Sequence, residues 1–535
     1  MIEFNAGRPA AQSPHGMVTS PHALASRAGA DLLRRGGSAV DAAIAASATL
    51  SVVYPHMTGI GGDAFWLIHD AATGAVRYID GGGRATSRAS LDAFARRGLA
   101  EVPYRGPLVG TLTVPGSVAS WTMAHAAYGR LPLARCLDTA IGYARDGFPM
   151  SARLAHWCEA VREELAKSPE AAAIFLGGGK MLANPDLART LQAIASDGWY
   201  GFYAGDVARE LVRWSQANDG FFTADDLGAQ VARWGEPLKG SYRDVTIFET
   251  PAPTQGFAVL QMMHLLEPFE LHRKPFLGAD AVHLMVQAKQ LAYHDRDRHL
   301  ADPRFADVPM DRLVSRAHAD ARRPLMDPAR AIPWDRLPSE GTLAGDTVYI
   351  AAVDRDGNAA SLIHSLYGGF GAAVVAGRTG VVLQNRAAYF TLDPGHPNRV
   401  EPGKTPLHTL IASLGFRNGK LWSVLGCMGA DGQPQIHLQT YLAMIDHGLD
   451  IQQAVEMPRF LSGRFAIGQP RDMLHLEARF PRATLDELER RGHTLDRWGD
   501  WNVLAGHAHG ITIDPVTGMR SGGADPRSDG VAVGC

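Results

Sequence analysis

One threonine stands where a covalent nucleophile would be expected. An apolar, β-branched run begins at Thr347, is interrupted by a polar turn centred on Asp356, and then resumes, which predicts a β-hairpin. In that hairpin Ser365 faces Thr347 across the ladder, with the two Cβ atoms about 5 Å apart. A cut between Asp346 and Thr347 would free an α-amine that can deprotonate the threonine's own hydroxyl. Such a pattern is more often an ordinary hairpin, so other features of the sequence are needed to distinguish it from an N-terminal nucleophile.

A glycine-rich turn later in the chain could supply the electrostatic part of the same chemistry. The expected strand 422–425 runs into the segment GCMGADGQ at 426–433. Two consecutive backbone N–H groups in such a turn can stabilise an oxyanion. A plain tight turn is the alternative interpretation, and by itself the better one.

The segments around these residues alternate between helix and strand signals. Two Ala-rich helices are expected between Pro21 and Val53, with Ser38 capping the second. A strand at 65–69 follows the glycine cluster of GIGGDAF. Because a dinucleotide site needs its glycines between a strand and a helix, close backbone packing is favoured there over nucleotide binding. The Asp-, Pro- and Arg-rich segment 301–346 is predicted to be an exposed linker, where a cut is tolerated.

Composition excludes several classes of protein. The 535 residues are 46% hydrophobic and 20% charged, with a net charge of −3, so neither disorder nor nucleic-acid binding is indicated. No stretch is long and apolar enough to span a membrane, and the start has no secretory pattern, so a cytoplasmic protein is expected. The four cysteines form no CxxC pair, and the 21 histidines are scattered without HExxH. No metal and no organic cofactor is therefore expected.

Ordered motifs along nearly the whole chain resemble the gamma-glutamyltransferase family of N-terminal nucleophile hydrolases. They include GMVTSPHALAS at 16–26, GIGGDAF at 59–65, TVPGSVASW at 113–121, DTVYIAAVDRDGNA at 346–359 and ADPRSDG at 524–530. The resemblance implies an α+β fold, a four-layered αββα sandwich. It also implies self-cleavage before Thr347 into a large subunit, 1–346, and a small catalytic subunit, 347–535, that stay together as one folded unit.

Four residues match the catalytic positions of the family. Thr347 matches the nucleophile, and Ser365 falls where the family has a second threonine that hydrogen-bonds it. Gly429 and Ala430 match the glycine pair whose backbone amides bind the oxyanion. An alanine keeps its N–H, so this function can survive if the backbone needs no positive φ there.

The positions that hold a glutamyl amino group do not match. Family members that use glutathione bind it with an acidic residue, a glutamine and an asparagine, which appear here as Tyr389, Arg386 and Tyr367. The first change removes a negative charge. The second places a cation where an ammonium would sit, and like charges at close range repel by several kcal/mol when partly desolvated.

The carboxylate-binding positions differ as well. The family's arginine matches Gly82, with Arg84 two residues on, and its two serines appear as His408 and Thr409. The pattern resembles the branch that includes oxamate amidohydrolase. Arg386, Arg84 and His408 converging on an acid would suit a small dicarboxylic monoamide, or the distal carboxylate of a glutaryl-type acyl chain. Each of the three could also be a structural salt bridge or cap.

The function expected from these residues is a self-processing amidohydrolase that cleaves an amide of a small acidic substrate, oxamate-like or glutaryl-like, through a Thr347 acyl-enzyme. A true gamma-glutamyltransferase or glutathione hydrolase is the alternative enzyme, and an unprocessed binding protein is the alternative class. The expected partners are the acidic amide substrate and the two processed subunits. The sequence does not decide between hydrolysis and transfer, and it leaves a homodimer of the processed unit open.

Overall fold

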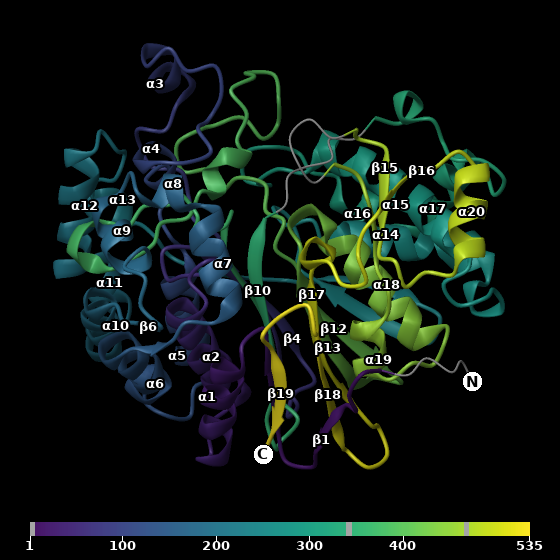
Figure 1. Ribbon diagram of the computed structural model, residues 1–535, viewed down its shortest axis with the longest axis horizontal. Coiled ribbons are helices and arrows are strands. Elements are labelled where there is room, and N and C mark those ends of the chain that lie inside the picture. Colours follow the sequence, from purple (N-terminus) through teal and green to yellow (C-terminus); the bar gives the residue numbers. More distant parts are fainter. Residues whose placement is uncertain (1–5, 339–344, 465–469) are drawn as a thin grey trace.

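Two facing β-sheets form the centre of the molecule, and helices cover both outer faces (Figure 1). The computed structural model describes residues 6–338, 345–464 and 470–535. The first sheet has the strand order β19 (Val531–Gly534), β2 (Met17–Ser20), β10 (Asp346–Val353), β11 (Ala359–Tyr367), β3 (Asp63–His69), β4 (Val76–Gly81) and β7 (Arg233–Gly235). The second has the order β1 (Ala11–Ser13), β18 (Arg520–Ala524), β17 (His507–Ile513), β13 (Lys420–Met428), β12 (Ala412–Arg417), β9 (Val245–Glu249) and β8 (Leu238–Tyr242).

The helices divide into two groups, one beside each sheet, with α1 to α13 on the left of Figure 1 and α14 to α20 on the right. The first group is α1 (Ala23–Arg34), α2 (Ala39–Val53), α3 (Leu91–Arg96), α4 (Pro107–Gly110), α5 (Ser117–Tyr128), α6 (Leu133–Asp146), α7 (Ala152–Ala160), α8 (Arg162–Leu165), α9 (Pro169–Phe175), α10 (Pro185–Asp197), α11 (Trp199–Tyr203), α12 (Asp206–Ala217) and α13 (Ala224–Gly228). The second is α14 (Phe257–Leu266), α15 (Ala279–His299), α16 (Met310–Leu313), α17 (Arg316–Arg322), α18 (Gln433–Ile445), α19 (Ile451–Glu456) and α20 (Arg482–Arg490). Small sheets join β5 (Phe148–Pro149) to β6 (Met181–Leu182), and β14 (Phe460–Ser462) to β15 (Met473–Leu476) and β16 (Thr494–Arg497).

The central hairpin shows how the four layers are built. Side chains alternate between the two faces of a strand. Along β10, Val348 and Ile350 accordingly pack into the core beneath the first helix layer, while Tyr349 and Ala351 pack against the second sheet. The α+β, four-layered αββα sandwich expected from the sequence is confirmed.

Two sequence expectations near the hairpin are also confirmed. Ser38 caps α2 in a capping box with Asp41, and every residue of α2 is buried, as its small side chains predict. The glycine cluster before β3 allows close backbone contact: a Cβ built on Gly61 would lie 2.1 Å from the Val382 carbonyl oxygen, and one on Gly62 would lie 2.1 Å from that of Ser365. The cluster therefore supports the end of β11.

The expected exposed linker is confirmed only in part: most of residues 303–338 are exposed or half-buried, but the segment contains short helices and a few buried side chains. Helices α16 and α17 lie within it, and Asp302, Leu313 and Ala319 are buried. Each of these short helices buries a single residue, so neither leaves a periodic apolar pattern in the sequence. Residues 339–344 of that linker lie outside the described residues. Within the described ranges, every helix is too short or too polar to cross a membrane.

Candidate active site

Thr347 and Ser365 meet at the start of the central hairpin. The pairs from Val348↔His364 to Val353↔Ala359 follow the register expected from the sequence, with an irregularity before Val348. The Thr347 Oγ1 hydroxyl donates to Ser365 Oγ at 3.1 Å, and Thr347 is 1% exposed. The Ser365 hydroxyl in turn donates to the Asp346 carbonyl oxygen at 2.6 Å. Ser365 thus polarises the carbonyl of the Asp346–Thr347 bond and keeps the threonine hydroxyl beside it.

Asp346 carries a buried carboxyl next to that bond. Its side chain lies on the helix-layer side of β10, where burial raises the pKa to about 7 against the opposing charge of Arg105. A carboxyl whose folded pKa lies above its ordinary value of 3.8 favours folding at low pH, and this contribution is lost as the pH rises through 7.

We therefore expect Asp346→Asn, made in a Thr347→Ala background that stays uncut, to stabilise the precursor at pH 8 by roughly 4 kcal/mol at most. The free energy of unfolding of Thr347→Ala alone should fall between pH 4 and 7 relative to the double variant, as measured by urea unfolding across that range. If the free energies of unfolding of the two proteins changed in parallel with pH, ionisation of the buried Asp346 carboxyl would not destabilise the fold.

The turn after β13 contains Gly429 and Ala430, the two residues whose backbone N–H groups are expected to bind an oxyanion. Gly429 has a φ of 145° and Ala430 a φ of 44°. The condition set for an alanine at this position is therefore not met, because Ala430 adopts a left-handed conformation that costs about 1 kcal/mol. A Cβ built on Gly345 would lie 3.0 Å from the Ala430 Cβ, so the uncut chain passes close to this turn.

Three residues, one just before α14 and two on α15, hold the strained turn, and no motif pointed to their role. Gln255 Nε2 donates to the Ala430 and Thr409 carbonyls, each at 2.9 Å. Arg296 donates to Gln255 Oε1 at 2.9 Å and to the Asp431 carboxylate. The Tyr293 hydroxyl donates to the Asp431 carbonyl. Since all three lie more than 130 positions before the turn, only the fold brings them to it.

Gln255→Glu tests whether this support matters for chemistry. The glutamate keeps the shape of the side chain but turns a donor to two carbonyls into an acceptor, so the turn should lose its fixed geometry. We expect kcat to fall at least tenfold with KM nearly unchanged, because an oxyanion site acts mainly in the transition state. Steady-state kinetics of the processed enzyme measures the split, and a change confined to KM would contradict it.

Arg386 lies buried between two tyrosines beside this turn. It is 1% exposed, and its guanidinium carbon lies 4.5 Å from the ring centroid of Tyr367 and 5.2 Å from that of Tyr389. Nη1 donates to Thr409 Oγ1 at 3.3 Å, whereas Nη2 has no acceptor among the described residues. Burial lowers the pKa of the group. A desolvated cation with an open donor is suited to binding an anion.

The tyrosines on either side of Arg386 are themselves constrained. Tyr367 has a φ of 81°, a conformation that a bulky residue adopts only when its surroundings impose it. Tyr389 donates its hydroxyl to Asp431 Oδ2. The two aromatic faces thereby fix the plane of the guanidinium and tie it to the oxyanion turn.

His408 lies near Arg386 but supplies no positive charge. It is fully buried, its Nε2 is 3.3 Å from Asp63 Oδ2, and its ring packs edge-on against Phe65. Burial lowers its pKa to about 4 despite Asp63, so the imidazole is neutral at pH 7. Its effect on a substrate would be steric or through a hydrogen bond.

Arg84, the third residue expected to bind the acid, makes its contact elsewhere. Its guanidinium donates to the Val231 carbonyl at 3.0 Å. Burial, together with Arg233 and Arg304, lowers its pKa to about 10. Among the described residues, the hydrogen bond of the Arg84 side chain goes to Val231, whereas that of Arg386 goes to Thr409.

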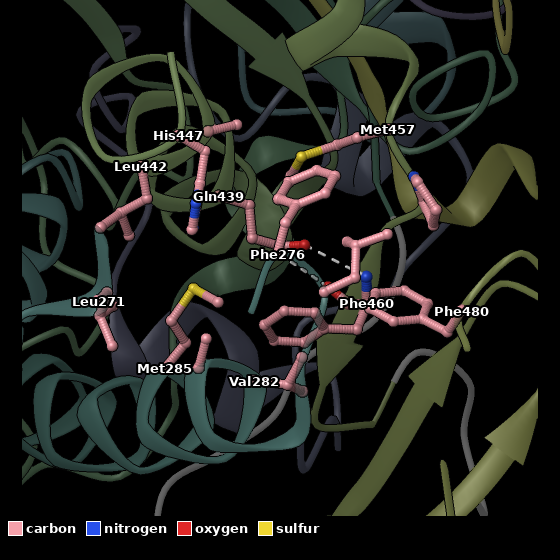
Figure 2. A pocket seen from close by; sticks show the side chains of 14 residues that line it. Leu271, Phe276, Val282, Met285, Gln439, Leu442, His447, Met457, Phe460 and Phe480 are labelled. Carbon is pink, nitrogen blue, oxygen red and sulfur yellow. Dashed lines mark hydrogen bonds between the residues drawn. The ribbon is translucent and has the colours of Figure 1, made fainter. Parts of the chain in front are cut away.

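Two other features of the structure lie apart from this chemistry. Among the described residues, ligand atoms of Asp41, His125 and Cys136 come within 4.8 Å of one another, but Asp41 Oδ2 already accepts three backbone N–H groups, one in the α2 cap and two from the loop between α5 and α6. Figure 2 shows a pocket whose labelled walls are mostly apolar, among them Phe460 and Met285. It holds none of the polar residues described above.

A buried threonine near the start of a central strand of an αββα sandwich, close to a strained glycine turn, is the arrangement typical of N-terminal nucleophile hydrolases. The family model of gamma-glutamyltranspeptidase matches residues 25–535. The chain belongs to this family and is an enzyme of that class.

Similar proteins span the whole chain. The glutathione hydrolase-like YwrD proenzyme of Bacillus subtilis is 40% identical over 97% of this chain and 98% of its own length. The oxamate amidohydrolase proenzyme of Klebsiella pneumoniae is 39% identical over 98% and 99%. The crystal structure of cephalosporin acylase from Bacillus halodurans is 32% identical and superposes with a TM-score of 0.91, covering 100% of this chain and 98% of its own.

Proposed function

We propose that this enzyme is a self-processing amidohydrolase that cleaves amides whose acyl half carries an acid group. The observation that carries the proposal is Arg386, a buried guanidinium with an open donor, next to Thr409 and close to the oxyanion turn. A carboxylate would satisfy that donor and neutralise the cation. Because Arg84 points elsewhere and His408 is neutral, Arg386 is the residue we expect to select the acid.

Self-cleavage would begin at the bond that Ser365 polarises. Thr347 Oγ1 attacks the Asp346 carbonyl carbon, the peptide nitrogen leaves as the Thr347 amine, and an ester remains on Oγ1. Water then hydrolyses the ester, which gives subunits 1–346 and 347–535. Removal of the Asp346 carboxyl from its buried position would favour this step.

Turnover would use the same hydroxyl a second time. The freed Thr347 amine acts as general base, directly or through a water, and Oγ1 attacks the substrate amide. The Gly429 and Ala430 N–H groups stabilise the oxyanion. The amine leaves, and water releases the acid from the acyl-enzyme.

The printed names of the relatives support two substrate classes. An oxamate amidohydrolase and a cephalosporin acylase act on amides other than glutathione, which agrees with the acid-binding proposal. The second candidate is cleavage of glutathione or gamma-glutamyl amides, favoured by the glutathione hydrolase-like relative. Arg386 counts against it, because the cation would face the substrate ammonium.

Intact mass with N-terminal sequencing, followed by a substrate panel, tests the proposal. Two chains, one starting at Thr347, are expected. Turnover of oxamate or a glutaryl amide without release of 4-nitroaniline from gamma-glutamyl-4-nitroanilide would support the acid-amide function. Rapid release of 4-nitroaniline alone would establish the second candidate instead.

A further inference from the structure

Three side chains of the first helix layer bring a carboxylate, an imidazole and a thiol together, and none of the chemistry above uses them. Asp41 lies in the first turn of α2, His125 in the last turn of α5, and Cys136 near the start of α6. We call them the Asp41 triad. Figure 1 draws these helices at the lower left, and α2 packs against both of the others. Since Asp41 and Cys136 are 95 positions apart, no short sequence motif joins them.

The ligand atoms of the triad lie at nearly the spacing of a metal coordination sphere. Cys136 Sγ lies 3.7 Å from Asp41 Oδ1, and His125 Nε2 lies 3.8 Å from the same oxygen. One atom from each residue falls within 4.8 Å of the other two. In a tetrahedral zinc site, with bonds of about 2.0–2.3 Å, neighbouring ligand atoms are about 3.3–3.6 Å apart. Movements of roughly 1 Å or less would therefore let the three atoms share one ion.

The Asp41 carboxylate is already oriented for this role. Its Oδ2 accepts the backbone N–H groups of Ser38, Arg130 and Leu131 at 2.9, 2.9 and 3.1 Å. These bonds fix the plane of the carboxylate and leave Oδ1 facing the thiol and the imidazole. Carboxylates that bind metals are commonly held by such outer hydrogen bonds.

The other contacts within the triad are ones that a metal can replace. A thiol is a weak hydrogen-bond donor, and Cys136 Sγ lies 3.7 Å from Asp41 Oδ1 and 3.9 Å from the Pro132 carbonyl oxygen. On metal binding an Sγ–metal bond would form and the thiol proton would pass to water, because a coordinating thiol is deprotonated. The Leu131 carbonyl oxygen, 2.7 Å from His125 Nε2, or a water would supply the fourth ligand.

The donor set and the exposure indicate which ion would bind. A sulfur, an imidazole nitrogen and a carboxylate oxygen form a mixed set that Zn²⁺ accepts in tetrahedral geometry, whereas Mg²⁺ and Ca²⁺ prefer oxygen ligands. One thiolate and one carboxylate would neutralise the two charges of the ion. Asp41 and Cys136 are buried, but the His125 side chain is 21% exposed, which gives the ion a path from solvent.

We propose that the Asp41 triad is a structural Zn²⁺ site that joins the start of α2 to α5 and α6. All of α2 is buried, and it packs against β10 and β11, so the ion would stabilise the layer that supports the strand containing Thr347. Because the ligands come from three helices, metal binding would be coupled to the folded arrangement of those helices. The site takes no part in the amidohydrolase chemistry, so the two proposals can fail separately.

The test measures zinc binding by the full-length protein without an affinity tag. The protein is stripped with a chelator, loaded with Zn²⁺, desalted and analysed by elemental mass spectrometry. One Zn²⁺ per chain should be retained, and competition with a chelator should show an affinity at least about tenfold lower in Cys136→Ser and in His125→Ala. Cys158→Ser is the matched control, because Cys158 is buried on α7, outside the triad. Co²⁺ in place of zinc should give a thiolate-to-cobalt charge-transfer band that Cys136→Ser lacks.

Several outcomes would overturn the proposal. They are no zinc retained by the unmodified protein, an equal zinc affinity in Cys136→Ser and Cys158→Ser, and no charge-transfer band with Co²⁺. Zn²⁺ should also raise the Tm of the stripped protein but not that of Cys136→Ser, and a Tm that ignores zinc would refute the structural role. If Cys136→Ser does not fold, the partly exposed His125 decides, because unchanged zinc affinity in His125→Ala would equally refute the site.

Discussion

Thr347→Ala is expected to remain one uncut chain of 535 residues and to show no amide hydrolysis. The variant removes the hydroxyl that attacks the Asp346 carbonyl, so self-cleavage has no nucleophile and no N-terminal amine forms. Self-cleavage and amide hydrolysis are both lost because both require Thr347 Oγ1. Activity should fall by a factor of at least about 10⁴, the usual size when a covalent nucleophile is removed. Intact mass and a continuous amidase assay measure the two effects.

Thr347→Ser and Ser365→Ala serve as companions to that variant. Serine keeps the hydroxyl, so Thr347→Ser should still cleave, whereas Ser365→Ala loses the hydrogen bond to the Asp346 carbonyl and should cleave more slowly. Full cleavage and activity in Thr347→Ala would refute the assignment of the nucleophile. Unchanged cleavage rates in Ser365→Ala would remove Ser365 from the self-cleavage step.

Arg386→Met is expected to raise the free energy of unfolding and to lower kcat/KM for acid amides strongly. The guanidinium is almost fully buried, makes one hydrogen bond of 3.3 Å to Thr409, and has an open Nη2. Replacing an uncompensated buried charge by an apolar side chain should raise the free energy of unfolding by about 1–4 kcal/mol. The value is measured by urea unfolding in the Thr347→Ala background.

The cost of the same substitution should appear in kcat/KM for acid amides. Loss of a desolvated charge partner for a carboxylate is worth about 2–5 kcal/mol, which is a decrease of roughly 30- to 4,000-fold. Arg399→Met is the matched control, because Arg399 is partly exposed and pairs with Glu401. Lower stability together with unchanged selectivity for acid amides would identify Arg386 as a structural residue.

The sequence by itself determined the features that depend on local pattern. The alternation around Asp356 predicted the hairpin and placed Ser365 opposite Thr347; the structure has that register from Val348 onward, and the two hydroxyls are hydrogen-bonded across an irregularity at Thr347. The cap at Ser38 and the small residues that follow predicted a buried helix, which is α2. Ordered motifs along the chain indicated the family. These signals work because side-chain period, capping and turn chemistry act over a few residues.

Only the tertiary structure decided which residues form the site. Arg84 and His408 were expected beside Arg386, but one points to Val231 and the other is buried and neutral. The left-handed Ala430 is held by Gln255 from 175 positions away. Contacts of this range leave no periodic trace in a sequence. Burial makes the His408 imidazole neutral and leaves Arg386 Nη2 without an acceptor among the described residues, and it exists only after the layers have packed.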